Sequence, residues 1–496
     1  MITNEQEIQM KQQPDKKRSK NHLDIPNFKI EQSKKIDITA NSGVFLVVEL
    51  IKKMDMIEKF AELDIFVRKT IGEAVHILTL VINQFTGGDA IYDTKYVKAD
   101  GALQTIFGDM HIPAPHTSGD FLERFTEQTT DKLRDIIWKM QEKYLKKLSK
   151  RFNRKITISL DSSVYEVYGN CKENSSQSYK NIFGFHPLLL HIHQTGELLD
   201  IMFRPGAEFT SAGAVNMLEA NIVRLKPYFD EIILLADAGF YEKAIVHFCE
   251  RDDIKIKFII TSEINNPIRQ QLSAPERIWT EPEQPTDETT SEVKHRDSHT
   301  FNYRLQSLKD QLRKKGKALK IRGALEVAEF DHTVAAWKKT FRFVFKRQLI
   351  MKQNLVEQSE LFEATEEYFY HGYVTNIDDQ SIEQIISLID SRGHQENFIK
   401  DFKRGLGTVH IPTKHFYGNY AYFLISMLSW NLKCWLLYII EPELQIYWKR
   451  FRYLFIKVGA QIIKTGRYVI IRFGKNFDRV TEFSKWFERL QQPLYA

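Results

Sequence analysis

Two apolar runs that each end in an aspartate place the strongest constraint on the fold. The run EIILLAD ends at Asp237, and its continuous apolar residues are typical of a buried strand. The run KITISLD ends at Asp161, and its alternation of apolar and polar residues also indicates a strand. We therefore predict that each aspartate presents its carboxylate where a buried strand reaches the end of a sheet.

The order of the elements around these runs indicates the type of sheet. The segments KITISLDSSVYEVYG, GFHPLLLHIHQ and ELLDIMFRPG are predicted strands, with Thr195 and Gly196 at a hairpin turn. A helical stretch, SAGAVNMLEANIVRLKPYF, precedes EIILLAD, and the helix YEKAIVHFCERD and the strand KIKFIIT follow it. Three antiparallel strands followed by β-α-β units is the order of an RNase H-like fold, an α/β fold with a mixed sheet flanked by helices. In this order the two aspartates meet at adjacent strand ends.

A third acidic residue, Glu396, lies in the segment SRGHQENFIKDFKRG. Its spacing from Arg392 and Lys403 brings all three side chains to one face of a helix. An adjacent apolar stripe lets this helix dock on a core, and it consists of Phe398, Ile399, Phe402 and Leu406. A carboxylate flanked by two cations suits a phosphate that is bound through a metal ion. The structural alternatives are a cap or turn role for each aspartate and an Arg392–Glu396 salt bridge.

The spacing R-x3-E-x6-K resembles the Y-x2-R-x3-E-x6-K signature of cut-and-paste insertion-sequence transposases with a DDE site. The segments LDSSVYEVYG, GFHPLLLHIHQTGELL, RPG and LLADAGFYEKAIVHFCE resemble the core of that family in the same order. The segment GGDAIYDTKYVKADGALQTIFGDMHIPAPHTSGDFLERF resembles the N-terminal region of the thirteen-eighty group. The resemblance thus covers most of the chain. One departure is Ile389, which stands where the signature has tyrosine, so a role for a phenol at that point is in doubt.

The resemblance implies a DDE-type DNA transposase, a polynucleotidyl transferase and endonuclease that cuts and joins double-stranded DNA. Asp161, Asp237 and Glu396 are then the catalytic residues and the ligands of two Mg²⁺ ions, for which Mn²⁺ can substitute. Arg392 and Lys403 would hold DNA phosphates. Bringing two element ends to a target implies a homodimer in the active complex. Two rivals are a DNA-binding transposase relative without activity and an RNase H-like nuclease that never joins strands.

The periodicity of the chain divides it into six parts. They are a disordered tail (1–40), a helical DNA-binding domain (41–150), the first part of the RNase H-like core (151–270), an insertion domain (271–371), the second part of the core (372–440) and a basic C-terminal region (441–496). The helical domain is expected to recognise the element ends, although scaffolding or dimerisation fits the same pattern. Within the insertion, YRLQSLKDQLRKKGKALK is predicted to be a helix, and FRFVFKRQLI and YFYHGYVTNI are predicted to be strands.

Cations gather in three runs, at 16–20, 309–322 and 449–475. The third run has interleaved aromatic residues that are compatible with DNA contact: Trp448, Phe451, Tyr453, Phe455, Tyr468 and Phe473. The alternative for each run is the charged face of an ordinary amphipathic element. The formal net charge of +6 is modest for this length, so composition by itself only permits an anionic partner.

Three further features bear on location and metal binding. The cysteines, at positions 171, 249 and 434, form no CxxC pair, and the polar N-terminus has no apolar signal segment, so we expect a protein of the reducing cytoplasm. The resemblance implies a bacterial protein that is associated with the nucleoid. The run NYAYFLISMLSWNLKCWLLYII is long enough to span a bilayer, but Asn431 and Lys433 in its middle favour a buried core helix and no membrane partner. The histidines at 186, 191 and 193 suggest zinc, but no further ligand completes a site, which favours packed strand residues.

Overall fold

The computed structural model describes residues 36–65, 71–282, 299–315, 317–354 and 365–492, and it defines no side-chain positions for 299–304, 353–354, 365 and 393–396. Most of the predicted tail, with the basic run at 16–20, lies outside the described residues. Its last residues do not, because β1 (Ile38–Thr39) pairs with β13 (Ala460–Lys464), which pairs with β14 (Val469–Phe473). The segment Ile38–Ala496 forms one compact unit by its contacts. The predicted domain boundaries inside it stay predictions.

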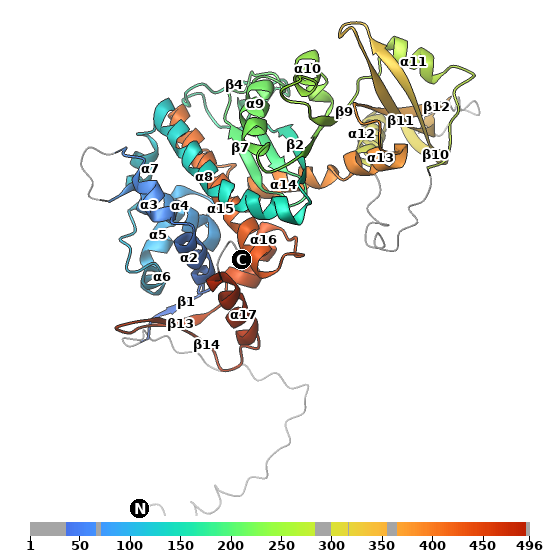
Figure 1. Cartoon of the computed structure of the whole chain (residues 1–496). Helices are drawn as coiled ribbons and strands as arrows, with labels where there is room; N and C mark the ends of the chain where they lie inside the picture. Colours follow the sequence, from blue (N-terminus) through green and yellow to red (C-terminus); the bar gives the residue numbers. More distant parts are fainter. Residues whose placement is uncertain (1–35, 66–70, 283–298, 316, 355–364, 493–496) are drawn as a thin grey trace, which may run out of the picture. The chain divides into compact units, whose positions relative to one another are not determined.

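A mixed sheet of eight strands is the centre of this unit (Figure 1). Its order is β10 (Lys317–Val334), β11 (Lys339–Asn354), β12 (Thr365–Thr375), β9 (Lys257–Thr261), β8 (Glu231–Ala236), β2 (Lys155–Ser162), β6 (Leu188–Ile192) and β7 (Leu198–Met202). β8 runs parallel to β2 and β9, whereas β6 is antiparallel to both of its neighbours, β2 and β7. The three predicted antiparallel strands and the following β-α-β units are therefore confirmed. Gly196 adopts a φ of +73° in the predicted turn between β6 and β7.

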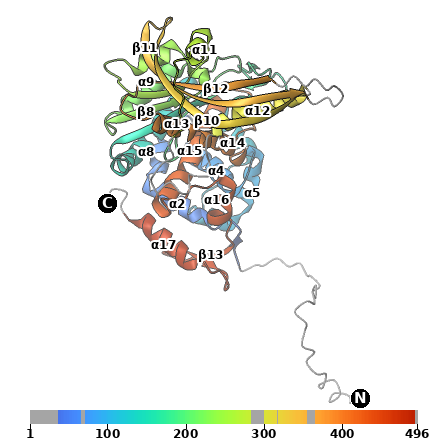
Figure 2. The ribbon, with the colours of Figure 1, turned by 90° about the vertical axis from the view of Figure 1, so that its right-hand side faces the viewer.

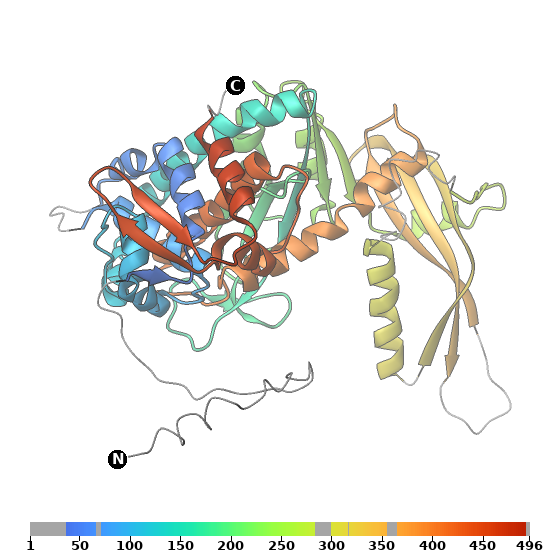
Figure 3. The same cartoon turned by 90° about the horizontal axis from the view of Figure 1, so that it is seen from below.

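The strands predicted within the insertion continue the same sheet, because β12 pairs with β9. One prediction here is wrong at its end. The helix α12 (His299–Lys314) stops before the KALK segment, and Lys317 already begins β10. Pairing along β11 outweighs the helix preference of Lys, Ala and Leu in this segment. Figure 3 shows α12 in yellow beside the long strands. A small core joins the helix to these strands. It consists of Leu305 and Leu312 of α12, Leu319 of β10 and Ile350 of β11.

Helices cover the sheet and form most of the rest of the unit. Those of the first half are α2 (Val44–Lys53), α3 (Met56–Ala61), α4 (Glu73–Thr86), η1 (Ile91–Asp93), α5 (Thr94–Ala99), α6 (Gly101–Ile106), α7 (Pro115–Leu122), α8 (Glu127–Arg151), α9 (Ala214–Leu225), η2 (Ala238–Phe240) and α10 (Lys243–Cys249). Later helices are α11 (Asn266–Leu272), α13 (Ile382–Asp390), α14 (Gly393–Gly405), α15 (Phe416–Ile440), α16 (Trp448–Phe451), η4 (Arg452–Ile456) and α17 (Val480–Gln491). A small sheet consists of β3 (Tyr165–Glu166), β5 (Phe183–Phe185) and β4 (Ser176–Gln177).

The long apolar helix α15 is buried, as predicted. It lies among α2, α4, α8 and α17 (Figure 2), and 83% of its most apolar 18-residue window is inside the molecule. It is the one helix in the described residues that is long and apolar enough to cross a membrane. Both polar residues in its middle have partners. The Asn431 amide accepts from the Leu198 N–H (2.9 Å) and donates to the Leu198 carbonyl (2.8 Å), so it caps the edge strand β7. The Lys433 ammonium lies 3.9 Å from the Asp401 carboxylate.

The aromatic residues of the third basic run divide into buried and exposed side chains, with Phe473 half-buried between them. Trp448, Phe451 and Phe455 are fully buried, so for these three side chains the reading as DNA contacts is wrong. They pack with Phe85 of α4 and Trp486 of α17 in the common core. Tyr453 and Tyr468 are exposed. In the sequence, a buried aromatic residue and an exposed one can both stand beside a cation. The sequence pattern therefore does not distinguish buried from exposed aromatic residues.

Candidate active site

The two predicted aspartates lie at the ends of neighbouring strands of the sheet, Asp161 within the last residues of β2 and Asp237 directly after β8. Leu160 of β2 pairs in parallel register with Ala236 of β8, so Asp161 and Asp237 come next at the same end of both strands. This confirms the predicted geometry. The Asp161 carboxylate accepts from the N–H of Ser162 (2.7 Å), and the Asp237 carboxylate accepts from the N–H of Gly239 (2.9 Å). Asp161 is 13% exposed and Asp237 is 38% exposed, so both carboxylates are held by local bonds while one faces solvent.

Arg392 joins the two carboxylates. It lies between α13 and α14, and its Nη2 donates to Asp161 Oδ2 at 3.0 Å and lies 3.9 Å from Asp237 Oδ2. The guanidinium is only 7% exposed. Arg392 therefore pairs with aspartates at the ends of β2 and β8. The structural alternative from the sequence was a salt bridge with Glu396. Glu396 belongs to α14, and its side chain lies outside the described residues.

Lys403 reaches the same strand end from the other end of α14. Its ammonium donates to the carbonyl of Val164 at 2.6 Å and lies 4.2 Å from the centre of the Tyr165 ring. Burial lowers the pKa of Lys403 to about 8; the charge of Lys180 adds to this shift, and Asp161 opposes it. An anion that binds beside such a buried ammonium stabilises its charged form and so raises its pKa again. The structure thus brings four of the five predicted site residues together.

Sequence reasoning missed a second layer behind Asp161. The imidazole Nδ1 of His186 lies 3.0 Å from the Glu208 carbonyl, and its Nε2 lies 2.8 Å from the Ser162 hydroxyl. A carbonyl only accepts, so Nδ1 carries the proton and Nε2 accepts from Ser162. Burial lowers the pKa of His186, which favours this neutral form. Neither contact follows from local spacing.

Arg204, in the segment RPG, is the centre of that layer. The guanidinium is 4% exposed, and burial lowers its pKa to about 10. It donates to four backbone carbonyls, which belong to His186, Phe209, Thr210 and Ala212. The resemblance of RPG to a known core was the available signal for this residue. Its contacts show that it fixes the loop that follows β7.

The position where the signature has tyrosine is a core position here. Ile389 is 3% exposed and packs with Ile233 and Leu235 of β8 and Tyr373 of β12. An apolar side chain therefore fills a site on the sheet side of α13. No phenol is available from this position, and the Arg392 contacts form without one.

The donor set at the two strand ends fits a hard divalent cation. Asp161 and Asp237 supply carboxylate oxygens, which are the ligands that Mg²⁺ prefers. Among the described side chains, no group of three or more His, Cys, Asp or Glu is placed to hold a metal ion, and Glu396 is not one of those side chains. The three histidines make no zinc site within the described part of the chain: His191 packs edge-on against Phe398, and His193 contacts the Ser391 hydroxyl at 2.8 Å. The three cysteines are free.

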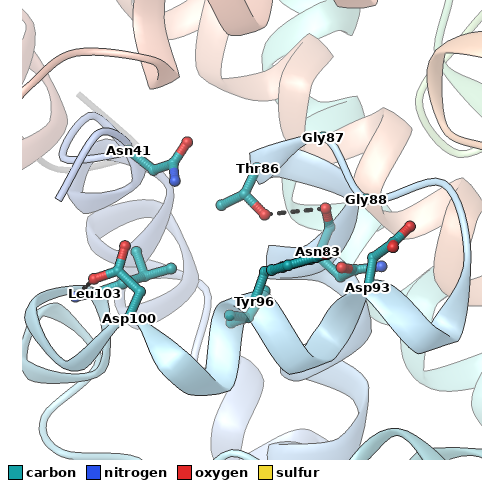
Figure 4. Close-up of a pocket in the computed structure, with 10 residues that line it drawn as sticks. Asn41, Asn83, Thr86, Gly87, Gly88, Asp93, Tyr96, Asp100 and Leu103 are labelled. Atoms are coloured by element: carbon teal, nitrogen blue, oxygen red, sulfur yellow. Dashed lines mark hydrogen bonds between the residues drawn. The ribbon is translucent and has the colours of Figure 1, made fainter.

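A pocket lies elsewhere, among α4, η1, α5 and α6 (Figure 4). Its volume is about 250 Å³, and its lining includes the amides of Asn41 and Asn83 and the carboxylates of Asp93 and Asp100. The hydroxyl of Thr39 donates to Asp100, which also caps α6, and Asp93 accepts two backbone N–H groups. These carboxylates serve local structure. None of the predicted site residues lines this pocket.

Comparison with known proteins gives the family. The chain matches the family described as transposase DDE domain group 1 over residues 32–494. No curated protein matches it. Among solved structures, it is similar to a piggyBac transposase synaptic complex with hairpin DNA, with 11% sequence identity, coverage of 90% of this chain and 80% of that chain, and a TM-score of 0.36. That likeness is too weak to assign a role to any residue.

Proposed function

The chain belongs to the group 1 family of transposase DDE domains, and on this premise we propose that it catalyses cut-and-paste transposition of an insertion sequence of the thirteen-eighty group. The reaction is cleavage of double-stranded DNA at the element ends, followed by attack of the freed 3′-hydroxyl on a new phosphodiester. One observation supports it most directly. Asp161 and Asp237 stand at neighbouring strand ends with the Arg392 guanidinium in contact with Asp161 and close to Asp237.

In this proposal Asp161, Asp237 and Glu396 hold two Mg²⁺ ions, with Mn²⁺ as a substitute. Such ions, when bound, supply Lewis acidity and neutralise charge on the attacking and leaving oxygens. The chain's own residues orient the DNA. Arg392 is buried beside both aspartates and can offer a planar pair of donors to a phosphate, whereas Lys403 supplies a point charge.

The strand order supports an RNase H-like core. In order of their appearance in the chain, the core strands are β2, β6, β7, β8 and β9, and β2 lies in the middle of them with β6 on one side and β8 on the other. This places both aspartates at the ends of the two neighbouring strands β2 and β8, within the group of five core strands. We further propose that the segment 271–371 is an insertion that contacts DNA, although its strands continue the core sheet.

The remaining assignments concern the whole assembly. We propose that residues 41–150 recognise the element ends and that the active complex is a homodimer in the bacterial cytoplasm, at the nucleoid. The packing of α4 and α8 on α15 is equally compatible with a scaffold. Footprinting with variants of α2–α8 distinguishes end recognition from scaffolding. If these helices recognise the ends, the variants protect a different DNA sequence; if they are a scaffold, the protected sequence stays the same.

The test uses the purified full chain, Mg²⁺ and a labelled DNA duplex. The duplex carries the terminal repeat of the proposed insertion sequence, which is the repeat that flanks the gene of this protein. A transposase gives both cleaved ends and products joined to a second duplex. Cleaved but never joined products would identify an RNase H-like nuclease without strand transfer. Binding to the repeat without cleavage in either Mg²⁺ or Mn²⁺ would identify an inactive DNA-binding relative.

A further inference from the structure

One exposed aromatic side chain lies in a loop whose neighbouring residues contact the surroundings of both aspartates. Phe209 lies in the loop after β7 and is 81% exposed. Single exposed apolar residues are common on protein surfaces, so exposure by itself indicates nothing. The backbone that carries Phe209, however, is held far more firmly than an ordinary surface loop.

The buried guanidinium of Arg204 immobilises this backbone. It donates to the carbonyl of Phe209 and to that of Thr210, each at 3.2 Å, and to that of Ala212. The N–H of Ala212 also donates to the Phe209 carbonyl, at 3.1 Å. Burying a guanidinium to hold a solvent-facing loop has a considerable desolvation cost. The consequence is that the Phe209 ring is presented from a fixed point.

The two chain neighbours of Phe209 connect it to both aspartates. On one side, the Glu208 carbonyl accepts from His186, which contacts Ser162 directly beside Asp161. On the other side, the Thr210 methyl group packs so closely on Gly239 that a β-carbon there would lie 2.6 Å from it. The N–H of Gly239 in turn holds the carboxylate of Asp237. The position of Phe209 is thereby set relative to the two strand ends.

We propose that the Phe209 ring stacks on a DNA base beside the bond that the Asp161–Asp237 site cleaves, and that it unstacks that step of the duplex. This inference rests on the proposed function. Every base has a π face, so a stacking ring needs no particular sequence, and a rigid carrier loses little conformational entropy on binding. A second exposed ring, that of Tyr179, has its centre 5.5 Å from the centre of the His186 ring.

The experiment compares two duplexes that carry the repeat flanking the gene, one fully paired and one with mismatched bases at the cleavage step. Phe209→Ala should cleave the paired duplex about tenfold more slowly than the wild type. It should regain the wild-type rate on the mismatched duplex, where unstacking is already done. Phe209→Trp should keep the rate on both. Val223→Ala is the control, because Val223 is 58% exposed on α9, which leads into the opposite end of β8.

A 2-aminopurine beside the cleaved bond gives a second readout, measured without divalent metal so that the DNA stays intact. Its fluorescence should rise with the wild type and stay low with Phe209→Ala. Two outcomes would overturn the inference: a wild-type rate of Phe209→Ala on paired DNA, or an equal loss of rate on both duplexes. A wild type that cleaves neither duplex would instead overturn the proposed function, and this inference with it.

Discussion

Asp390 and Arg392 lie two residues apart at the junction of α13 and α14, yet the ion pairs that they form have opposite surroundings. Both oxygens of Asp390 accept from the Lys346 ammonium at 2.7 Å, and the Tyr373 hydroxyl donates to one of them at 3.1 Å. Lys346 is fully buried, and burial lowers its pKa while Asp390 opposes that shift. Arg392, in contrast, is shared between two aspartates, one of which is 38% exposed.

The difference distinguishes an ion pair that stabilises the packing of two elements from one whose carboxylate is accessible to a ligand. The Lys346–Asp390 pair joins β11 to the end of α13; its lysine is fully buried and its aspartate is 13% exposed. Desolvated pairs of this kind contribute little net stability but are costly to break. The Arg392 site has a solvent-facing carboxylate, Asp237, beside the strand end that bears Asp161. The most exposed carboxylate of the two sites, that of Asp237, therefore belongs to the second site, where we propose that the metal ion and the phosphate bind.

The largest expected effect comes from removing the three carboxylates that we propose to bind metal. Asp161→Asn, Asp237→Asn and Glu396→Gln should each reduce Mg²⁺-dependent cleavage on the order of a thousandfold or more, because metal assistance supplies several kcal/mol of transition-state stabilisation. Binding to the element end should stay near the wild-type level. Cleavage of a labelled end and a gel-shift assay measure the two quantities.

Asp230→Asn is the matched control, because Asp230 immediately precedes β8 and Asp237 immediately follows it. Asp230 is 70% exposed and pairs with Arg154 at the opposite end of the sheet. Its variant should cleave normally. Near wild-type cleavage by one of the three site variants would remove that residue from the metal site.

The next effect comes from breaking the closed pair. Lys346→Met leaves a buried carboxylate without its cation and should reduce the free energy of unfolding by roughly 3–5 kcal/mol, measured by urea denaturation. Replacing both partners, with Lys346→Met and Asp390→Leu, should recover most of that loss because no buried charge remains. If the single variant is as stable as the wild type, the contrast between the closed and the open pair is wrong.

The sequence predicted the parts of this comparison that depend on local pattern. Apolar runs located β2 and β8, and their order placed Asp161 beside Asp237. Helical spacing predicted one face for Arg392, Glu396 and Lys403, and the structure shows that Arg392 directly precedes α14 and that Lys403 lies near its end. The partner of Arg392 was beyond such reasoning, since periodicity offers only neighbours three or four residues away, and Asp161 lies 231 positions away. The same holds for Lys346 and Asp390, which are 44 positions apart and meet through the pairing of β11.

Arg392 itself should have an intermediate effect. Arg392→Met removes a charge-assisted donor and should slow strand transfer roughly 10- to 150-fold while changing DNA affinity little, because it is one phosphate contact among many. Single-turnover transfer rates and binding isotherms measure the two quantities. The opposite outcome, a lower melting temperature with normal transfer by the folded protein, would make Arg392 a structural residue like Lys346.

The smallest effect concerns the exposed cations of α12 and β10. The dependence of DNA affinity on salt concentration measures it. The contribution of the Lys346–Asp390 pair to the free energy of unfolding should respond little to salt, since its lysine is fully buried. The logarithm of DNA affinity, in contrast, should fall linearly with the logarithm of salt concentration. Deleting 301–322 is a poor probe, because Leu305, Leu312 and Leu319 belong to a core. Neutralising the exposed cations of α12 and β10 keeps that core. The variant carries glutamine at Lys309, Arg313, Lys314, Lys320 and Arg322. Its salt slope should flatten by about 0.9 for each DNA phosphate that the variant no longer neutralises. An unchanged slope, with normal joining of ends, would show that this face is ordinary solvated surface.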